Sequence, residues 1–532
     1  MASSPGRVAL TLPISGECTV GDTLRFWAES SPDAPFLIFD PVDDGPRRYT
    51  YAEFLEMAMR TVGLMTSLGL ACGDRFAVVL DNSPEFLACW FGAAIAGTVM
   101  VPVNPNSTVD DLRYVFDHAQ CRAVICGANQ RRNVESAWCG PASRVITAHH
   151  GFADLSAPAP SSYAPQIAGC DPLAVLYTSG TTSRPKGVVV THANYLAAGS
   201  TVAGQLRMRT DDRWLVVLPL FHANAQYYCV MSALVTGASV AVTARFSASR
   251  WGAQVRNLGA TLASLFAAPI RMVLATPESG EDADNGLRAT VFAQNITRAQ
   301  LMTFQNRFDC PLLQLYGMTE TIAPPLMNPL YGPSDSMSIG LPTEPGRVRV
   351  VDEDGHDVAP GEIGELLIGG IPGQTLMAGY LADDATTGQA ITDGWLHTGD
   401  IVRQRSDGFL VFHDRAKNMI KRAGENVAAA EVERVIDSHP GVHESAVIGV
   451  PDEMRDEAIK AFVVPNKPGL DSLDEDELIE FCSHRLPRGK VPDQVEIVVQ
   501  LPYTAVGKIR KDLLLNHGGA AHQVRRSPVA GG

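Results

Sequence analysis

Apolar and polar positions along the first two-thirds of the chain follow one repeating pattern. Short apolar runs rich in β-branched residues alternate with longer stretches that have helical spacing. The clearest of these runs are 76–80, 99–103, 123–126, 174–177, 214–218 and 239–242. Strands that alternate with helices favour parallel sheets covered on both faces. We therefore expect an α/β fold with doubly wound sheets in a large N-terminal domain.

The pattern changes after about residue 345. Apolar runs at 347–351, 364–368 and 409–412 are joined by Gly/Asp turns, which predicts a more antiparallel β subdomain. A small mobile α+β domain is expected next, with helices at 429–438 and 474–482 and strands at 445–450 and 458–464. We predict domains at 1–413 and 414–517. A tail at 518–532, rich in Gly, Ala and Arg, is predicted to be disordered.

The longest apolar run, 86–101, contains two glycines and is closed by Pro102. It is shorter than the roughly 20 residues that a membrane helix needs, so it predicts a buried helix leading into a buried strand. We expect no transmembrane segment. Residues 1–13 lack a basic-then-apolar signal pattern, which favours a cytoplasmic location.

Charge and cysteine content narrow the class of protein. The 532 residues carry a net charge of −15, which argues against a nucleic-acid partner. The ten cysteines include no Cys-x-x-Cys pair, so we expect reduced thiols in place of disulfides or a zinc site. An anionic nucleotide would need locally placed cations, and Lys186, Arg415 and Lys508 are candidates.

A loop of small hydroxylated residues precedes one of these cations. Its candidate phosphate-binding residues are Thr178, Ser179, Gly180, Thr181, Thr182 and Lys186. Small residues let main-chain N–H groups approach an anion, and the hydroxyls and the lysine add donors. The spacing does not fit the P-loop pattern. A flexible turn between two strands is the alternative.

The stretch 177–190 resembles the signature loop of the acyl-adenylate-forming superfamily, which includes acyl-CoA synthetases, luciferases and peptide-synthetase adenylation domains. Ser183 stands where glycine is usual. The resemblance runs from residue 22 to 515, with several motifs in family order. It implies binding of ATP/AMP, Mg²⁺ and coenzyme A as co-substrate. The partner it implies is a small-molecule carboxylic acid that is adenylated and then transferred to CoA. A homodimer stays open.

A second motif follows the apolar strand 312–315. A carboxylate just past a strand end can hold a hydrated Mg²⁺ near phosphates, although an exposed turn glutamate is the alternative. By the resemblance, Tyr316 stacks on adenine, Thr319 meets the α-phosphate and Glu320 binds Mg²⁺. Gly317 and Met318 lie between them and are also expected at the nucleotide.

Further along, Asp400 closes the segment Trp395–Asp400, and a turn residue is the alternative interpretation. The resemblance implies that Asp400 binds the ribose, that Arg415 contacts the nucleotide and that Lys417 is the hinge between the domains. Gly424 is expected beside the pantetheine arm of CoA.

Lys508 follows a glycine near the end of the chain. Such a lysine is usually a solvated charge. The resemblance implies that it reaches the active site and stabilises charge as the carboxylate attacks the α-phosphate. We expect it to be the most important side chain for adenylation.

His222 marks the expected acyl pocket. A lone His near an apolar run is more often a core residue, but this position resembles the aromatic or His position at the acyl pocket and CoA entrance. Relatives that activate amino acids place an aspartate here. Asn224 and Gln226 resemble the residues of carnitine/crotonobetaine-type CoA ligases at this motif. Where the family has a Gly-rich adenine-side segment, this chain carries Ala293 and Gln294 within 292–297.

The sequence leaves other functions open. The acyl acceptor could be a carrier-protein thiol, an amine or, as in luciferases, oxygen. A nucleotide-binding relative without turnover is the alternative from another class. The sequence does not identify the acid.

Overall fold

A computed structural model describes most of the chain. The described residues are 18–148, 165–178, 184–344, 346–415, 418–422, 425–452, 456–466, 473–503, 509–511 and 513–514.

The first large sheet has seven strands within the described residues, in the order β18-β8-β7-β4-β3-β5-β6. Their bounds are β3 Arg75–Val79, β4 Val99–Pro102, β5 Ala123–Cys126, β6 Val145–Thr147, β7 Pro172–Thr178, β8 Lys186–Thr191 and β18 Gly379–Tyr380. The central strands are parallel, whereas β8 and β18 are added antiparallel at one edge. The predicted strands in this part of the chain are therefore confirmed to within about two residues.

The second large sheet has nine strands in the described part of the chain, in the order β15-β14-β13-β12-β11-β9-β10-β1-β2. Their bounds are β1 Pro35–Asp40, β2 Arg47–Thr50, β9 Arg213–Val216, β10 Ser239–Thr243, β11 Leu262–Phe266, β12 Ala289–Ala293, β13 Leu312–Tyr316, β14 Leu326–Met327 and β15 Leu341–Pro342. The strands from β1 to β13 pair in parallel, apart from β2 at the edge. Parallel strands ending side by side bring the loops after β12 and β13 together.

Helices cover these sheets. They are α1 Val20–Ser30, α2 Tyr51–Ser67, α3 Pro84–Ala96, α4 Val109–His118, α5 Arg131–Ala137, α6 His192–Gln205, α7 Met231–Thr236, α8 Trp251–Leu258, α9 Ala267–Leu274 and α10 Arg298–Phe308. Every residue of α3 is buried, and the helix is bounded by an N-capping Ser83 and a left-handed Gly97. The apolar run at 86–101 is thus the predicted buried helix followed by a buried strand, β4.

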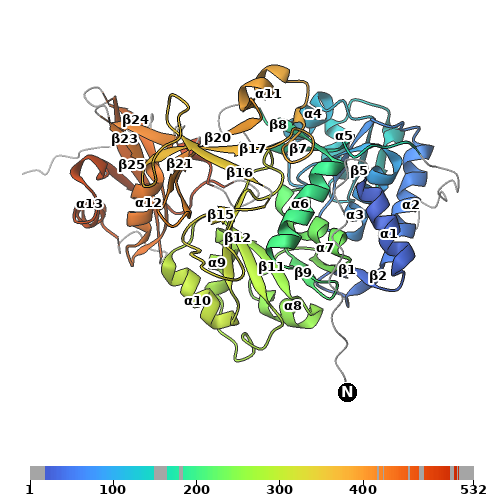
Figure 1. Ribbon diagram of the computed structural model, residues 1–532, viewed down its shortest axis with the longest axis horizontal. Helices are drawn as coiled ribbons and strands as arrows, with labels where there is room; N and C mark the ends of the chain where they lie inside the picture. Colours follow the sequence, from blue (N-terminus) through green and yellow to red (C-terminus); the bar gives the residue numbers. More distant parts are fainter. Residues whose placement is uncertain are drawn as a thin grey trace, which may run out of the picture.

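The change of pattern after residue 345 corresponds to a smaller antiparallel sheet. It is formed by β16 Arg347–Val351, β17 Ile363–Gly369, β19 Ile391–Thr392, β20 Trp395–Gln404 and β21 Leu410–Arg415, with α11 Asp384–Ala390 beside it. In Figure 1 this sheet lies between the two large sheets and the C-terminal unit.

The C-terminal unit, orange to red in Figure 1, has its own sheet and core. Its elements are β22 Met419–Arg422, β23 Glu425–Ala428, α12 Ala429–Asp437, β24 Val442–Asp452, β25 Asp456–Pro465, α13 Glu475–Ser483 and β26 Gln494–Ile497. The mixed α/β architecture with a large N-terminal and a smaller C-terminal part matches the expected fold class. The proposed tail at 518–532 lies outside the described residues.

Two simple expectations can be checked on these elements. None of the helices in the described ranges is both long and apolar enough to cross a membrane. All ten cysteines fall within those ranges, and all are free thiols.

Candidate functional site

The predicted phosphate loop connects two antiparallel strands. Thr178 at the end of β7 pairs with Lys186 at the start of β8. The Tyr114 hydroxyl donates a hydrogen bond of 2.8 Å to the Pro185 carbonyl, and the Arg184 guanidinium lies 5.2 Å from the centre of the Tyr114 ring. The residues that flank the loop are therefore anchored, and the backbone of Lys186 is held in the β7–β8 pairing.

Glu320 lies in a turn directly after β13. The Met318 N–H donates to Thr321 Oγ1, which in turn donates to the Met318 carbonyl, at 3.0 Å each. Ile322 follows with φ of 65°. This left-handed conformation is rare for a β-branched residue, and such outliers cluster at functional sites. The turn places the Glu320 side chain inward, where it is 6% exposed.

The Glu320 carboxylate is buried close to positive charge. Burial raises its pKa, while a hydrogen bond from Tyr380 and the charges of Arg415 and Lys186 act in the opposite direction. The Tyr380 hydroxyl donates 3.0 Å to Glu320 Oε1, and Lys186 Nζ lies 4.9 Å from the centre of the Tyr380 ring. The predicted magnesium and phosphate residues thus contact one tyrosine, Glu320 at its hydroxyl and Lys186 at its ring face.

Asp400 forms a second buried cluster with residues from two other strands. Tyr316, at the end of β13, donates its hydroxyl to Asp400 Oδ2 at 2.6 Å. Arg415, opposite Asp400 in the β20–β21 register, lies with Nε 2.8 Å from Oδ1. This ion pair is too poorly aligned to count as a hydrogen bond, so the buried Oδ1 keeps acceptor capacity. That capacity suits a ribose hydroxyl.

The hydroxyl of Tyr316 makes a contact of its own, separate from the expected stacking of the ring on adenine. Burial and the neighbouring Asp400 carboxylate raise the pKa of its phenol, which therefore stays protonated and acts as a donor. Its hydroxyl positions Asp400, and the partly exposed ring stays next to Gly317, which is exposed.

The residues expected on the adenine side lie at the end of β12, which is Ala293, and directly after it. Gln294 has φ of 75°, a left-handed conformation in which glycine is the least strained residue. Its carbonyl accepts a hydrogen bond of 3.0 Å from Gln314 Nε2. This conformation explains how Ala293 and Gln294 can occupy the place of a Gly-rich segment.

His222 differs from a core histidine whose ring nitrogens are both paired. Its Nε2 is buried and has no hydrogen-bond partner among the described residues, and burial lowers the pKa of the ring to about 4. The Phe221 ring lies 4.2 Å away, centre to centre. His222 is therefore neutral near pH 7 and offers an unused nitrogen.

Its neighbours form a π-helix, Asn224–Val230. Gln226 accepts from the Tyr195 hydroxyl at 2.5 Å and donates to the Leu220 carbonyl at 2.6 Å. Gln226 thus has an internal structural role. Asn224 Oδ1 accepts 2.8 Å from Ser264.

Several predicted site residues lie outside the described residues. They are Ser179, Gly180, Thr181 and Thr182 of the phosphate loop, the hinge residue Lys417, Gly424 and Lys508. Beside the proposed hinge, Asp414 Oδ2 accepts 2.9 Å from the Ala430 N–H at the start of α12. This contact links the last strand of the large part, β21, to the first helix of the C-terminal unit.

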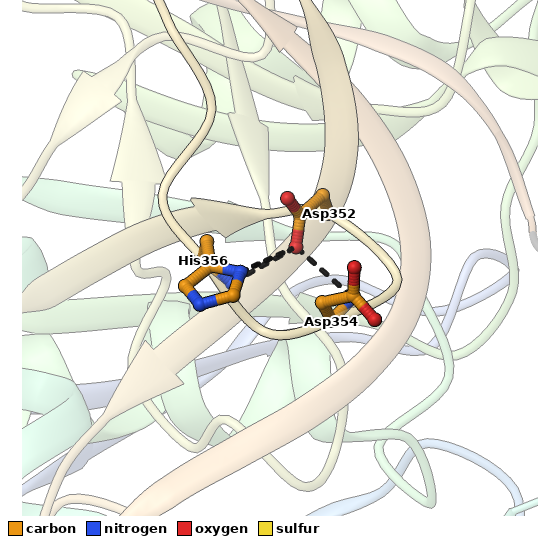
Figure 2. Close-up of side chains that lie close together, drawn as sticks. All are labelled: Asp352, Asp354 and His356. Carbon is orange, nitrogen blue, oxygen red and sulfur yellow. Dashed lines mark hydrogen bonds and ion pairs between the residues drawn. The ribbon is translucent and has the colours of Figure 1, made fainter.

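The buried carboxylate of Glu320 fits a hydrated Mg²⁺, because this ion is usually held by one or two carboxylates together with substrate phosphates. Among the described residues no side chain other than Tyr380 donates a hydrogen bond to this carboxylate. Within the described part of the chain, the group of three side chains with metal-ligand spacing is Asp352, Asp354 and His356, all exposed (Figure 2). There Asp352 Oδ1 accepts the N–H groups of Asp354 and His356 at 3.0 and 2.9 Å, so it caps the turn between β16 and β17.

Sequence reasoning missed Tyr380. It stands beside a glycine in the two-residue strand β18, and no motif distinguishes it. The signal that could have found it is structural, because Tyr380 pairs with Val188 of β8, two residues beyond Lys186.

The comparisons with known proteins agree with this geometry. The sequence matches the AMP-binding enzyme family over residues 24–381 and the AMP-binding enzyme C-terminal domain over 431–508. It is 36% identical to a crotonobetaine/carnitine–CoA ligase of Salmonella paratyphi A, over 92% of this chain and 98% of that protein.

Two solved structures share the fold along almost the whole chain. A benzoate CoA ligase from Burkholderia xenovorans is 27% identical, with a TM-score of 0.84 over 94% of this chain and 100% of that one. A Mycobacterium tuberculosis fatty acyl CoA synthetase is 30% identical, with a TM-score of 0.74 over 94% and 98% of the two chains. Because both family models match and a relative is similar over nearly its whole length, the chain belongs to the AMP-binding enzyme family.

Proposed function

We propose that this AMP-binding enzyme is an ATP-dependent acid–CoA ligase that works in two steps. A carboxylate oxygen attacks the α-phosphorus of ATP, which forms the acyl-adenylate and releases pyrophosphate. The CoA thiol then attacks the acyl carbon, and AMP leaves with the electron pair of the cleaved C–O bond. Because the adenylate is already activated, no nucleophile of the protein is needed.

One observation supports this proposal most strongly. Two buried carboxylates, Glu320 after β13 and Asp400 on β20, each lie near a partly exposed cation from another strand, Lys186 and Arg415 respectively. Buried charges are costly unless paired, and such clusters are typical of sites that bind a charged ligand. Preorganised groups of this kind stabilise developing charge without reorganising during the reaction.

Each residue then has a role on the nucleotide. Lys186, with Thr178, Ser179, Gly180, Thr181 and Thr182, holds the phosphates. Glu320 would hold Mg²⁺, which when bound screens the phosphate charge. Asp400 accepts from the ribose, with Tyr316 and Arg415 fixing its orientation. Thr319 faces the α-phosphate.

The small domain supplies the remaining groups. Lys508 compensates charge during adenylation, and rotation about Lys417 then brings Gly424 to the path of the CoA thiol. The proposed boundary at 414 falls in β21, the last strand before the C-terminal sheet.

The substrate class follows from the acyl side of the site. His222 carries no negative charge in either protonation state, so it cannot form the ion pair that an aspartate at this position would form with the ammonium group of an α-amino acid. Relatives of this chain are named for crotonobetaine and carnitine, and acids of that kind are the first candidates. Benzoate and fatty acids, named for solved relatives, come next.

We also propose a cytoplasmic location and keep a homodimer as a prediction. Light scattering on the eluting peak of a size-exclusion column would measure the mass directly, against 57.0 kDa for one chain.

The test is product analysis by mass spectrometry with ATP, Mg²⁺ and a mixed panel of these acids, with and without CoA. An acyl-CoA that forms only when CoA is present, together with AMP and pyrophosphate, supports the ligase. Adenylate that forms but never reaches CoA would point to a carrier-protein or amine acceptor. ATP binding without acid-dependent pyrophosphate release across the panel would favour a non-catalytic relative.

A further inference from the structure

Tyr380 occupies an unusual position between the two predicted phosphate-site groups of opposite charge. One end of its side chain, the hydroxyl, donates to Glu320 Oε1 at 3.0 Å. The face of its ring lies 4.9 Å from Lys186 Nζ. A cation over an aromatic face is attracted by the ring quadrupole, so both neighbours are bound through one residue.

The backbone around Tyr380 is fixed to both neighbours independently of its side chain. The Met377 N–H donates to the Glu320 carbonyl at 3.0 Å, and the Leu381 N–H donates to the Gly187 carbonyl at 2.7 Å. The segment 377–381 therefore connects the turn after β13 to the strand that carries Lys186.

A side-chain contact also fixes the angle at which the tyrosine enters the site. The Tyr380 N–H donates to Thr387 Oγ1 at 2.9 Å. Gly379 has φ of 151°, and a Cβ added there would lie 3.0 Å from Thr387, so the tight approach favours glycine. Because the backbone at Gly379 and Tyr380 has little conformational freedom, the phenol is held in place between its two partners.

A lysine and a glutamate that both contact one side chain could pair directly if that side chain were absent. No ion pair between Lys186 and Glu320 occurs in the structure, although Lys186 acts on the Glu320 carboxylate through its charge. A direct pair would occupy the two groups that the proposed function assigns to the phosphates and to Mg²⁺. It would have to be broken before nucleotide could bind, at a cost in affinity.

We propose that Tyr380 is a positioning residue that keeps Lys186 and Glu320 apart and separately oriented for the Mg²⁺–ATP complex. Its hydroxyl orients the carboxylate and its ring orients the ammonium group. This inference rests on the phosphate and metal roles proposed above for Lys186 and Glu320.

Two substitutions separate the two halves of the residue. Tyr380→Phe removes only the hydroxyl, and Tyr380→Leu removes the hydroxyl and the aromatic face. ATP binding is measured by calorimetry without Mg²⁺ and then over a series of Mg²⁺ concentrations. For Tyr380→Phe we expect unchanged Mg²⁺-free affinity and about a tenfold smaller gain on adding Mg²⁺, since one hydrogen bond to a charged group is lost. Tyr380→Leu should also lose Mg²⁺-free affinity, because Lys186 loses its platform.

The matched control is Tyr503→Phe, because the Tyr503 hydroxyl donates to the Glu444 carboxylate in the C-terminal unit. It removes the same type of hydrogen bond from a carboxylate to which no role at the nucleotide is assigned. Equal losses with and without Mg²⁺ in Tyr380→Phe, or a response no different from that of Tyr503→Phe, would overturn the inference.

Glu320→Gln separates this inference from the proposed function. If Glu320→Gln leaves the Mg²⁺ dependence of ATP binding intact, the metal role of Glu320 fails and the inference fails with it. If Glu320→Gln abolishes that dependence while Tyr380→Phe leaves it unchanged, only the positioning role of Tyr380 is wrong.

Discussion

The large domain and its contact with the small domain each contain a charged pair, and the two pairs are built in opposite ways. In the large domain, Asp400 is 1% exposed and is held by Tyr316 at 2.6 Å and Arg415 at 2.8 Å, from three different strands. At the contact with the small domain, Arg271 of α9 approaches Glu444 of β24 only to 4.0 Å. The first cluster is close and buried, whereas the second is at the outer limit of an ion pair.

This difference indicates which groups of the site already hold a fixed geometry before the nucleotide binds. Groups that bind the nucleotide gain from being fixed, because fixed dipoles and charges need not reorganise when it arrives. The rotation of the small domain proposed above would gain from contacts that cost little to break. At 4.0 Å Arg271 makes no hydrogen bond to Glu444, so this ion pair is weaker than the 2.8 Å pair of Arg415 and Asp400.

The largest effect is expected from the one catalytic group assigned to the small domain. Lys508→Ala should slow acid-dependent pyrophosphate release about 100–1000-fold, the range found when one stabilising donor is removed from a charged transition state. Thioester formation from supplied acyl-adenylate should change far less. Single-turnover kinetics of the two half-reactions measure both. Lys511→Ala, which removes a lysine that pairs with Glu433 at 2.7 Å, is the control, and equal loss of both half-reactions in Lys508→Ala would contradict the assignment.

A substitution in the large-domain cluster should weaken nucleotide binding more than it slows the chemical steps. Asp400→Asn keeps the shape but removes the charge that Arg415 and the ribose share, so the Kd for ATP should rise about 10–100-fold, as expected for loss of hydrogen bonds to a charged group. Calorimetry without an acid substrate measures this Kd. Asp357→Asn, in an exposed ion pair with Arg349, should change it by less than about twofold. A similar effect of both substitutions would remove the special status of the buried cluster.

Local pattern was enough to predict the large elements and several site residues. The strands at 123–126 and 347–351 were predicted with the observed bounds, since β-branched runs bounded by turn residues specify buried strands. The turn carrying Glu320 was predicted from its place after an apolar strand. These features depend on neighbouring residues only.

The missing features depend on pairing between distant segments. Tyr380 meets Lys186 because β18 pairs with β8, and no local period reveals that register. Asp400 meets Arg415 across β20 and β21, next to a register shift between Ile401 and Val402 that alternation alone cannot locate. The π-helix at Asn224–Val230 has no sequence rule of its own and was not predicted.

A smaller effect should appear in the stability of the small domain as pH changes. Burial, with the nearby Glu433 and Glu444, raises the pKa of Asp437 to about 7, although Ser445 and Arg271 oppose the shift. A carboxyl whose folded pKa is raised contributes stability below its unfolded pKa and loses it as pH rises through 7. Asp437→Asn cannot ionise, so above pH 8 the variant should be more stable than the wild type.

We expect this gain to reach about 2 kcal/mol, less than the full pKa shift implies at about 1.4 kcal/mol per unit, since Asp437 is partly exposed. Hydrogen exchange of the amides in α12 and β24 at pH 5.5 and 8.5 reports it locally. At pH 5.5 the difference should be smaller. A gain of equal size at both pH values would show that ionisation of Asp437 is not its cause.

The smallest effect is expected at the domain contact itself, and it tests the comparison most directly. Arg271→Gln removes the charge opposite Glu444 but leaves the Tyr503 hydroxyl on that carboxylate, so each half-reaction should change less than about threefold. Arg307→Gln is the matched substitution in α10, where Arg307 lies 2.7 Å from Asp282 and both side chains are under 10% exposed. Breaking that buried pair should cost about 3–5 kcal/mol of stability in urea unfolding, because Asp282 keeps an uncompensated charge. If Arg271→Gln instead abolished one half-reaction, the small-domain contact would be as specific as the nucleotide cluster, and the contrast between a fixed and an exchangeable half of the site would be wrong.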